Sequence, residues 1–229
     1  MPDLCGCGIA PLWARPVMRR VAGETLRPGG FVLTDRGALL AGLAPGQVVL
    51  DVGCGTGATV RRLRSRYGAR AVGLDARISE AGSLAAGTLP LARGLAQALP
   101  FAEGAFQALF CECVLSLLPD RKAALAEFRR VLLPDGVLVL SDLYQRIPES
   151  AGGASGSCAD SAPPLPDVVE QVRGAGFRVR IVEDHSALLR DLSARLVWAG
   201  EPVTNQGRCA GSAGYYLLLA DVVEESHAG

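Results

Sequence analysis

The sequence predicts an α/β protein built on one mainly parallel sheet. From about residue 46, short apolar runs alternate with segments whose apolar residues recur at three- and four-residue steps. A glycine-rich turn, DVGCGTG at residues 51–57, follows the first of these apolar runs. Such an alternation is typical of parallel strands joined by helical crossovers. A chain of 229 residues is long enough to bury the core of one such domain.

Five strands and three helices are expected between residues 46 and 145. The helix at 120–132 has the clearest pattern, because its apolar residues recur at helical spacing. The helix at 58–68 ends at a glycine, as helices often do, and PDG at 134–136 is typical of a turn. The expected strands are 47–53, 69–75, 89–94, 106–112 and 137–144, and the expected helices are 58–68, 76–87 and 120–132.

The rest of the domain is expected to begin with a loop at residues 150–164, which are small and polar and include prolines. After this loop we expect a helix within 166–177, a sixth strand at 177–184, a helix at 186–198 and a last strand at 214–222. The sequence shows no internal repeat and no second domain. Residues 1–30 have little periodicity, so we expect a separate amino-terminal segment, 1–30, followed by a single domain, 31–229.

Composition excludes several classes of partner. The 23 basic residues balance the 23 acidic ones, which argues against a surface for nucleic acids. No apolar run approaches the length that a membrane span needs, and the first residues lack the apolar core of a signal peptide. We therefore expect a cytoplasmic protein with a small-molecule substrate. The seven cysteines are an odd number, and the C-x-C pairs do not match common zinc spacings.

The glycine-rich turn predicts a nucleotide-type ligand. Glycines let the backbone approach a ligand closely, and Asp75, at the end of the second expected strand, could accept both hydroxyls of a ribose. Gly53, Gly55 and Ala58 also satisfy the fingerprint of enzymes that bind nicotinamide dinucleotides. However, the carboxylate of Asp51 would repel a pyrophosphate, whereas it suits a cationic amine. The electrostatics therefore favour S-adenosyl-L-methionine, which carries an amine and a sulfonium but no phosphate.

Four motifs in order resemble those of class I S-adenosylmethionine-dependent methyltransferases. They are DVGCGTG at 51–57, Asp75, RGLAQALPF at 93–101 and LLPDGVLVLSD at 132–142, and the resemblance covers about residues 30–222. It implies a Rossmann-like fold, a seven-stranded sheet with helices on both faces and an antiparallel last strand. It also implies that residues 1–30, with Trp13 among them, could cap the active site.

The resemblance assigns cofactor roles by position. Asp51 and the loop glycines would contact the methionine part, Asp75 the ribose, and Leu95 with Ala96 the adenine. Leu95 departs from the family, which usually has an aspartate or asparagine there to accept the adenine amino group. The full set expected to bind the cofactor is Asp51, Gly53, Cys54, Gly55, Gly57, Asp75, Ala76, Leu95, Ala96 and Cys111.

The sequence FCECV, residues 110–114, marks the expected acceptor site. The fourth strand ends near Cys111, and ligands of open parallel sheets bind beyond the carboxyl ends of the strands. The segment 111–144 and a later loop cysteine resemble arsenite methyltransferases. This resemblance implies, by position, that Cys113 and Cys158 would bind a metalloid. Cysteines suit this role because trivalent arsenic prefers sulfur ligands. Unlike that family, the chain has no cysteine in residues 8–53.

Other interpretations of the acceptor site stay open. The acceptor could be an ordinary carbon, oxygen or nitrogen atom, with Glu112, Tyr144 or His185 assisting. The chain could also be an inactive module that binds the cofactor or a metalloid. Cys111 and Cys113 could simply be small buried residues, which is common for free cysteine. The sequence does not determine the oligomeric state.

Overall fold

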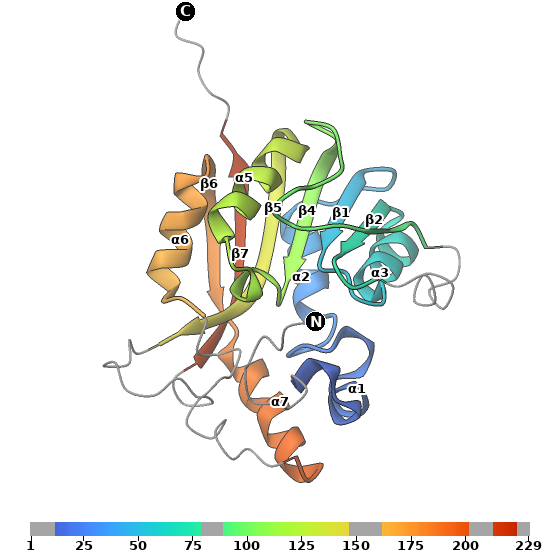
Figure 1. Ribbon diagram of the computed structural model, residues 1–229, viewed down its shortest axis with the longest axis vertical. Helices are drawn as coiled ribbons and strands as arrows, with labels where there is room; N and C mark the ends of the chain where they lie inside the picture. Colours follow the sequence, from blue (N-terminus) through green and yellow to red (C-terminus); the bar gives the residue numbers. More distant parts are fainter. Residues whose placement is uncertain (1–11, 79–88, 147–161, 202–212, 224–229) are drawn as a thin grey trace, which may run out of the picture.

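The computed structural model describes residues 12–78, 89–146, 162–201 and 213–223. Its centre is a seven-stranded sheet with the order β3-β2-β1-β4-β5-β7-β6 (Figure 1). Neighbouring strands from β3 to β5 are parallel, whereas β7 is antiparallel to both β5 and β6. The predicted fold class is confirmed, including the antiparallel last strand. The strands are β1 Val48–Val52, β2 Arg70–Asp75, β3 Leu91–Arg93, β4 Phe106–Glu112, β5 Leu132–Gln145, β6 Phe177–Asp184 and β7 Ala213–Val222.

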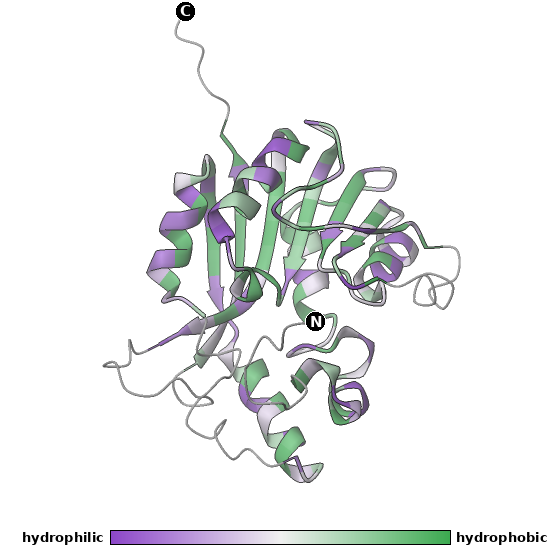
Figure 2. Cartoon of the chain, viewed as in Figure 1, coloured by the Kyte–Doolittle hydropathy of each residue, from purple (hydrophilic) through white to green (hydrophobic). Residues whose placement is uncertain are grey.

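Helices cover both faces of the sheet (Figure 1). α5 and α6 pack on one face, and α2 and α3 pack on the other. Figure 2 shows that the central strands are mostly hydrophobic, whereas the helices have hydrophilic outer faces. β7 is buried along its whole length, because it lies between two other strands and under both layers. The helices are α1 Pro16–Ala22, α2 Val32–Leu40, α3 Ala58–Tyr67, α5 Arg121–Val131, α6 Leu165–Gly174 and α7 Ser186–Trp198.

The described part of the amino-terminal segment folds onto the carboxyl edge of the sheet. α1 and α7 lie together beyond the carboxyl ends of β1 and β4, in the lower part of Figure 1. Val17 and Met18 of α1 pack against Leu192 and Leu196 of α7. The sequence predicted no element here, because α1 has only seven residues and its apolar side faces α7 rather than the sheet.

α2 was also missing from the expected elements. It has nine residues, and a glycine lies near its middle. The structure explains that glycine: a Cβ atom on Gly37 would lie 2.5 Å from Cγ1 of Val139 and 3.4 Å from the ring of Phe110. α2 therefore packs so closely on the sheet that only glycine fits at this position.

None of the helices in the described ranges is long and apolar enough to cross a membrane.

The strand expected at 137–144 begins five residues earlier, at Leu132. The PDG sequence predicted a turn, but it forms an irregularity within β5, where Asp135 has a φ of 61°. Phe106 pairs with Leu132 and Ala108 pairs with Val137, so the extra residues bulge out of the ladder. The predicted turn is thus a bulge between two paired parts of one strand.

The other expected elements agree within a few residues where the structure describes them. β4, β6 and α7 have the expected bounds, and Asp120 caps α5 by accepting a hydrogen bond from the Ala123 amide at 2.9 Å. β3 is shorter than expected. The helix expected at 76–87 and the loop at 150–164 lie mostly outside the described residues.

The contact between α2 and the sheet can be tested with one methyl group. Gly37→Ala should lower the free energy of unfolding by about 1–3 kcal/mol, because the added Cβ overlaps Val139. Gly174→Ala in α6 is the matched control, since a Cβ atom there has no neighbour within 4 Å. The control should be neutral or stabilising by at most about 1 kcal/mol, from helix propensity alone. Urea unfolding would measure both, and equal effects would contradict the close packing.

Candidate functional site

The glycine loop joins β1 to α3 at the carboxyl edge. Gly53, Gly55 and Gly57 have φ values of 77°, 52° and 79°, which other residues adopt only with strain. The Gly53 amide donates a 2.7 Å hydrogen bond to the Leu74 carbonyl, so the loop is tied to β2. A Cβ on Gly55 would meet no atom within 4 Å, and Gly55 is exposed. The backbone is therefore open to a ligand at Gly55.

Asp75 lies beside this loop. Its Oδ2 accepts a hydrogen bond from the Gly55 amide at 2.9 Å, and its Oδ1 accepts one from the Arg77 amide at 2.8 Å. These bonds hold the carboxylate between the glycine loop and the turn after β2. The two sequence-predicted features are thus adjacent, in an arrangement compatible with ribose binding.

Asp51, near the end of β1, has a buried side chain. Its Oδ2 has no hydrogen-bond partner. Burial raises the pKa of this carboxyl well above its usual range, and the charge of Glu112 raises it further. A buried carboxylate oxygen without a partner is costly, so a cationic ligand group would be favourable there.

Arg27 supplies a second group of this kind. Its Nε is the other buried side-chain nitrogen or oxygen without a hydrogen-bond partner in the described part of the chain. The two unpaired atoms belong to side chains of opposite charge, and Arg27 and Asp51 are close enough to affect each other's pKa. Together they would suit a ligand that carries both an ammonium and a carboxylate.

No sequence motif indicates the buried cluster that Arg27 forms with Glu112. Arg27 Nη2 lies 2.8 Å from Glu112 Oε2, and both side chains are almost inaccessible to solvent. Thr34 Oγ1 and Thr59 Oγ1 each donate a 3.0 Å hydrogen bond to Glu112, and Arg27 also donates to both hydroxyls. Burial alone would lower the pKa of Arg27, but Glu112, together with the smaller effects of Tyr215, Cys113 and Asp51, raises it.

This cluster gives Glu112 contacts that favour a structural role. Glu112 was expected to border the methyl acceptor, but its carboxylate is saturated by Arg27 and two hydroxyls and points toward α2 and α3. Strand alternation could have placed Glu112 on the same face as Phe110. It could not have supplied Arg27, which lies outside every motif.

Cys113 directly follows β4 and has a φ of 57°, one of three positive values among the described non-glycine residues. Its Sγ lies 3.0 Å from Tyr215 Oη, which is also 3.4 Å from Ser141 Oγ. Burial, with the charge of Asp142, raises the pKa of the half-buried thiol. Cys113 is therefore a neutral thiol in a polar contact. Its expected partner, Cys158, lies outside the described residues.

The two cysteines in the expected cofactor set, Cys54 and Cys111, face the core. Cys111 is completely buried in the cluster that packs under α5 and α6, so its side chain does not offer a surface to a ligand. The burial of Cys111 therefore does not support the expectation that its side chain faces the cofactor. Cys54 Sγ packs against β2, 2.7 Å from where a Cβ on Gly73 would lie, so only the Cys54 backbone can face the loop's ligand.

The remaining predicted residues lie at different depths. Leu95 is 58% exposed, Ala96 is buried and Ala76 is exposed. Tyr144 is buried, with its ring against Gly214 of β7. His185 Nε2 lies 2.9 Å from Glu183 Oε2, which makes a polar contact rather than a free base.

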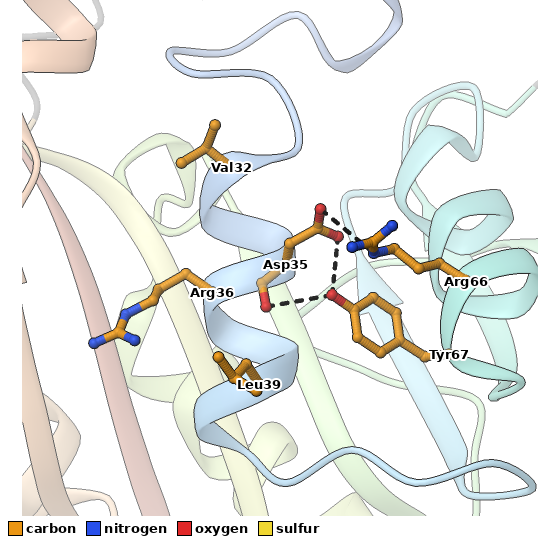
Figure 3. A pocket seen from close by; sticks show the side chains of 6 residues that line it. All are labelled: Val32, Asp35, Arg36, Leu39, Arg66 and Tyr67. Atoms are coloured by element: carbon orange, nitrogen blue, oxygen red, sulfur yellow. Dashed lines mark hydrogen bonds and ion pairs between the residues drawn. The ribbon is translucent and has the colours of Figure 1, made fainter.

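A separate groove of about 640 Å³ lies between α2 and α3 and contains none of the residues discussed above. Figure 3 shows that Tyr67 and Arg66 both turn toward Asp35 in this groove, with Tyr67 Oη donating a 3.0 Å hydrogen bond to Asp35 Oδ1. Asp35 is thus already paired within the protein. Among the described residues, no group of three histidine, cysteine, aspartate or glutamate side chains could hold a metal ion.

Comparison with known proteins agrees with this geometry. Residues 50–140 match a family model described as a methyltransferase domain. The O-methyltransferase cnsE of Penicillium expansum is 31% identical, in a match that covers 70% of this chain and 63% of that protein. The demethylmenaquinone methyltransferase of Mycolicibacterium paratuberculosis is 30% identical, and the match covers 59% of this chain and 70% of that protein.

Solved structures that share the fold include a cyclase and an N-methyltransferase. The (4+2)-cyclase SpnF has a TM-score of 0.75 at 21% identity, with 92% of each chain covered. The Haemonchus contortus phosphoethanolamine N-methyltransferase 2, in complex with S-adenosylhomocysteine, has a TM-score of 0.71 at 16% identity, covering 91% of this chain and 56% of that one. At these identities the likeness shows the fold alone. The chain spans between 34% and 63% of the length of four curated relatives that it matches.

The Arg27–Glu112 pair can be tested by a pair of substitutions and their combination. Arg27→Met should lower the free energy of unfolding by about 3–5 kcal/mol, because it leaves the buried Glu112 charge uncompensated. The double variant Arg27→Met, Glu112→Met should recover much of this loss, because no buried charge remains.

Arg61→Met is the matched control for this test, since the Arg61–Glu24 pair is largely exposed and should contribute little. Denaturant unfolding would measure all of these variants. A double variant at least as unstable as Arg27→Met alone would contradict the buried-charge explanation.

Proposed function

Because the chain belongs to the class I S-adenosylmethionine-dependent methyltransferases, we propose that it transfers a methyl group to an oxygen or carbon atom of a small organic acceptor. When bound, S-adenosyl-L-methionine would supply an electrophilic methyl group on its sulfonium. The observation that carries the proposal is the unpaired, buried Asp51 carboxylate beside an open glycine loop and the Asp75 carboxylate.

The residues at this edge fit the parts of the cofactor. Asp51 Oδ2 and Arg27 Nε, the two unpaired buried atoms, suit the ammonium and the carboxylate of an amino acid. Asp75 would exchange its hydrogen bonds with backbone amides for bonds to ribose hydroxyls. The backbone of the glycine loop would line the space between them, where Gly55 is exposed.

The charge of Asp51 couples cofactor binding to pH. Its raised pKa means that burial makes the ionised form costly in the free protein. A cationic ammonium would favour the ionised form, so binding would release a proton from the protonated fraction. Affinity for the cofactor should therefore rise as the pH increases through the pKa of Asp51, and it should be lower at pH values below that pKa.

The thiols favour an ordinary organic acceptor over arsenite. A metalloid needs thiolates, but the Cys113 thiol has a raised pKa and is engaged with Tyr215. Cys111 lies in the opposite layer of the core, so it cannot ligate the same ion. Among relatives, cnsE, resE and two further proteins are named O-methyltransferases, and a Synechocystis protein is named 2-methyl-6-phytyl-1,4-hydroquinone methyltransferase; none of these names includes a metalloid.

The protein itself would contribute to methyl transfer by holding the acceptor in position beside the methyl group. In-line displacement from a sulfonium depends on holding the acceptor at near-attack distance rather than on a strong base. The buried hydroxyls of Ser141 and Tyr215 fix the Cys113 thiol at the exit of β4. That thiol would form a rigid wall on the acceptor side of the cofactor, with a positioning role.

Asp51→Asn tests the cofactor site. The variant keeps the shape of the side chain but removes its charge, so S-adenosylhomocysteine should bind roughly ten- to a hundred-fold more weakly. The free energy of unfolding should not fall, because the raised pKa of Asp51 shows that the charge is unfavourable in the free protein. Calorimetry and thermal unfolding would measure the two effects. Unchanged affinity would remove Asp51 from the site.

A substitution at Cys113 tests the class of acceptor. Wild-type protein would be mixed with S-adenosylmethionine and phenols, hydroquinones, small acids or arsenite with a thiol, and S-adenosylhomocysteine formation would be followed. We expect turnover with an organic acceptor, which Cys113→Ser should retain within about tenfold because a hydroxyl preserves the contact with Tyr215. Turnover of arsenite that disappears in Cys113→Ser would instead support the thiol-ligand mechanism.

A further inference from the structure

The amino-terminal segment is attached on both sides of the glycine loop. Arg27 pairs with Glu112 at the end of β4, and Arg77, two residues after β2, lies over the ring of Trp13 with its guanidinium carbon 4.2 Å from the ring centroid. β1, which leads into the glycine loop, lies between β2 and β4 in the sheet. The segment from Trp13 to Arg27 therefore reaches across the loop from one neighbouring strand to the other.

The attachment at β2 lies beside the expected ribose site. The Arg77 amide donates to Asp75 Oδ1, and the Gly94 amide donates to the Asp75 carbonyl at 3.3 Å. Leu95, next to Gly94, exposes 58% of its surface at the same turn. A base attached to a ribose on Asp75 would thus meet apolar surface at Leu95, and Leu95 has no side-chain group that could accept a hydrogen bond from an adenine amino group.

The two attachments differ in strength. The Arg27–Glu112 pair is buried and is reinforced by hydrogen bonds with the hydroxyls of Thr34 and Thr59. Arg77, in contrast, is exposed, and its contact with Trp13 is a cation–π interaction in water. A flat guanidinium on an indole face occupies the position that a purine would take in a stacked pair. A purine could therefore replace it without disturbing the buried attachment.

From this arrangement we propose that the ring of Trp13 stacks on the purine in the adenosine subsite. In the free protein Arg77 covers this ring, and the purine displaces Arg77 when it binds. The inference rests on the proposed function and names a residue that binds the base. Stacking on Trp13 would supply the base affinity that the side chain of Leu95 cannot supply by hydrogen bonding. The residue type that matters is aromatic, so Trp13→Phe should preserve binding better than Trp13→Ala.

Fluorescence gives a direct test, because the chain has two tryptophans and Trp198 is 92% exposed. Trp198→Phe leaves Trp13 as the single reporter. Its emission should be quenched in a saturable way by S-adenosylhomocysteine and by 5′-methylthioadenosine, which has the adenosine but no amino-acid end. Heat of binding with unchanged emission would overturn the role of Trp13.

Affinity measurements separate the subsite from a structural role. Trp13→Ala should weaken both ligands by the same factor, roughly five- to a hundred-fold, whereas Asp51→Asn should weaken only S-adenosylhomocysteine. Trp13→Phe should stay within a few-fold of wild type. If Trp13→Ala binds both ligands with wild-type affinity, the proposed stacking of the base on Trp13 is wrong. If the wild-type protein binds neither ligand, the proposed function is wrong as well.

Discussion

The buried pair of Arg27 and Glu112 is the interaction on which the arrangement of the carboxyl edge depends. Glu112 ends β4, and its other hydrogen bonds come from α2 and α3, so one carboxylate joins four parts of the chain. Cys113 then leaves the strand with a positive φ, and Val114 packs on Gly53 where a side chain would otherwise project. The position of the glycine loop therefore depends on a charge pair on the neighbouring strand.

Glu112 and Asp51, two buried acids on adjacent strands, have opposite surroundings. Glu112 is paired with the charge of Arg27 and accepts hydrogen bonds from two hydroxyls, whereas Asp51 has an oxygen with no partner and a raised pKa. Environments that differ this much commonly separate structural acids from acids that meet a ligand. The contrast between these two carboxylates supports a ligand role for Asp51 more directly than the glycine pattern does.

The sequence could predict what depends on local pattern. Strand and helix periodicity located the central strands, and DVGCGTG with Asp75 located the two features that the fold brings together at the carboxyl edge. It could not predict Arg27, because a buried charge is recognised only by its partner, which is distant in the chain. Nor could it show that Cys111 and Glu112, adjacent in sequence, belong to opposite layers and that neither faces the acceptor freely.

The place of β7 in the sheet constrains how the protein is made. β7 is hydrogen-bonded to β5 on one side and to β6 on the other, although it is the last strand to be synthesised. Until residues 213–222 leave the ribosome, β7 is missing from its place between β5 and β6. The backbone edges of β5 and β6 that pair with β7 are then unpaired. Folding during translation must therefore stop at an open sheet, a state that is slow to complete and prone to associate with other chains.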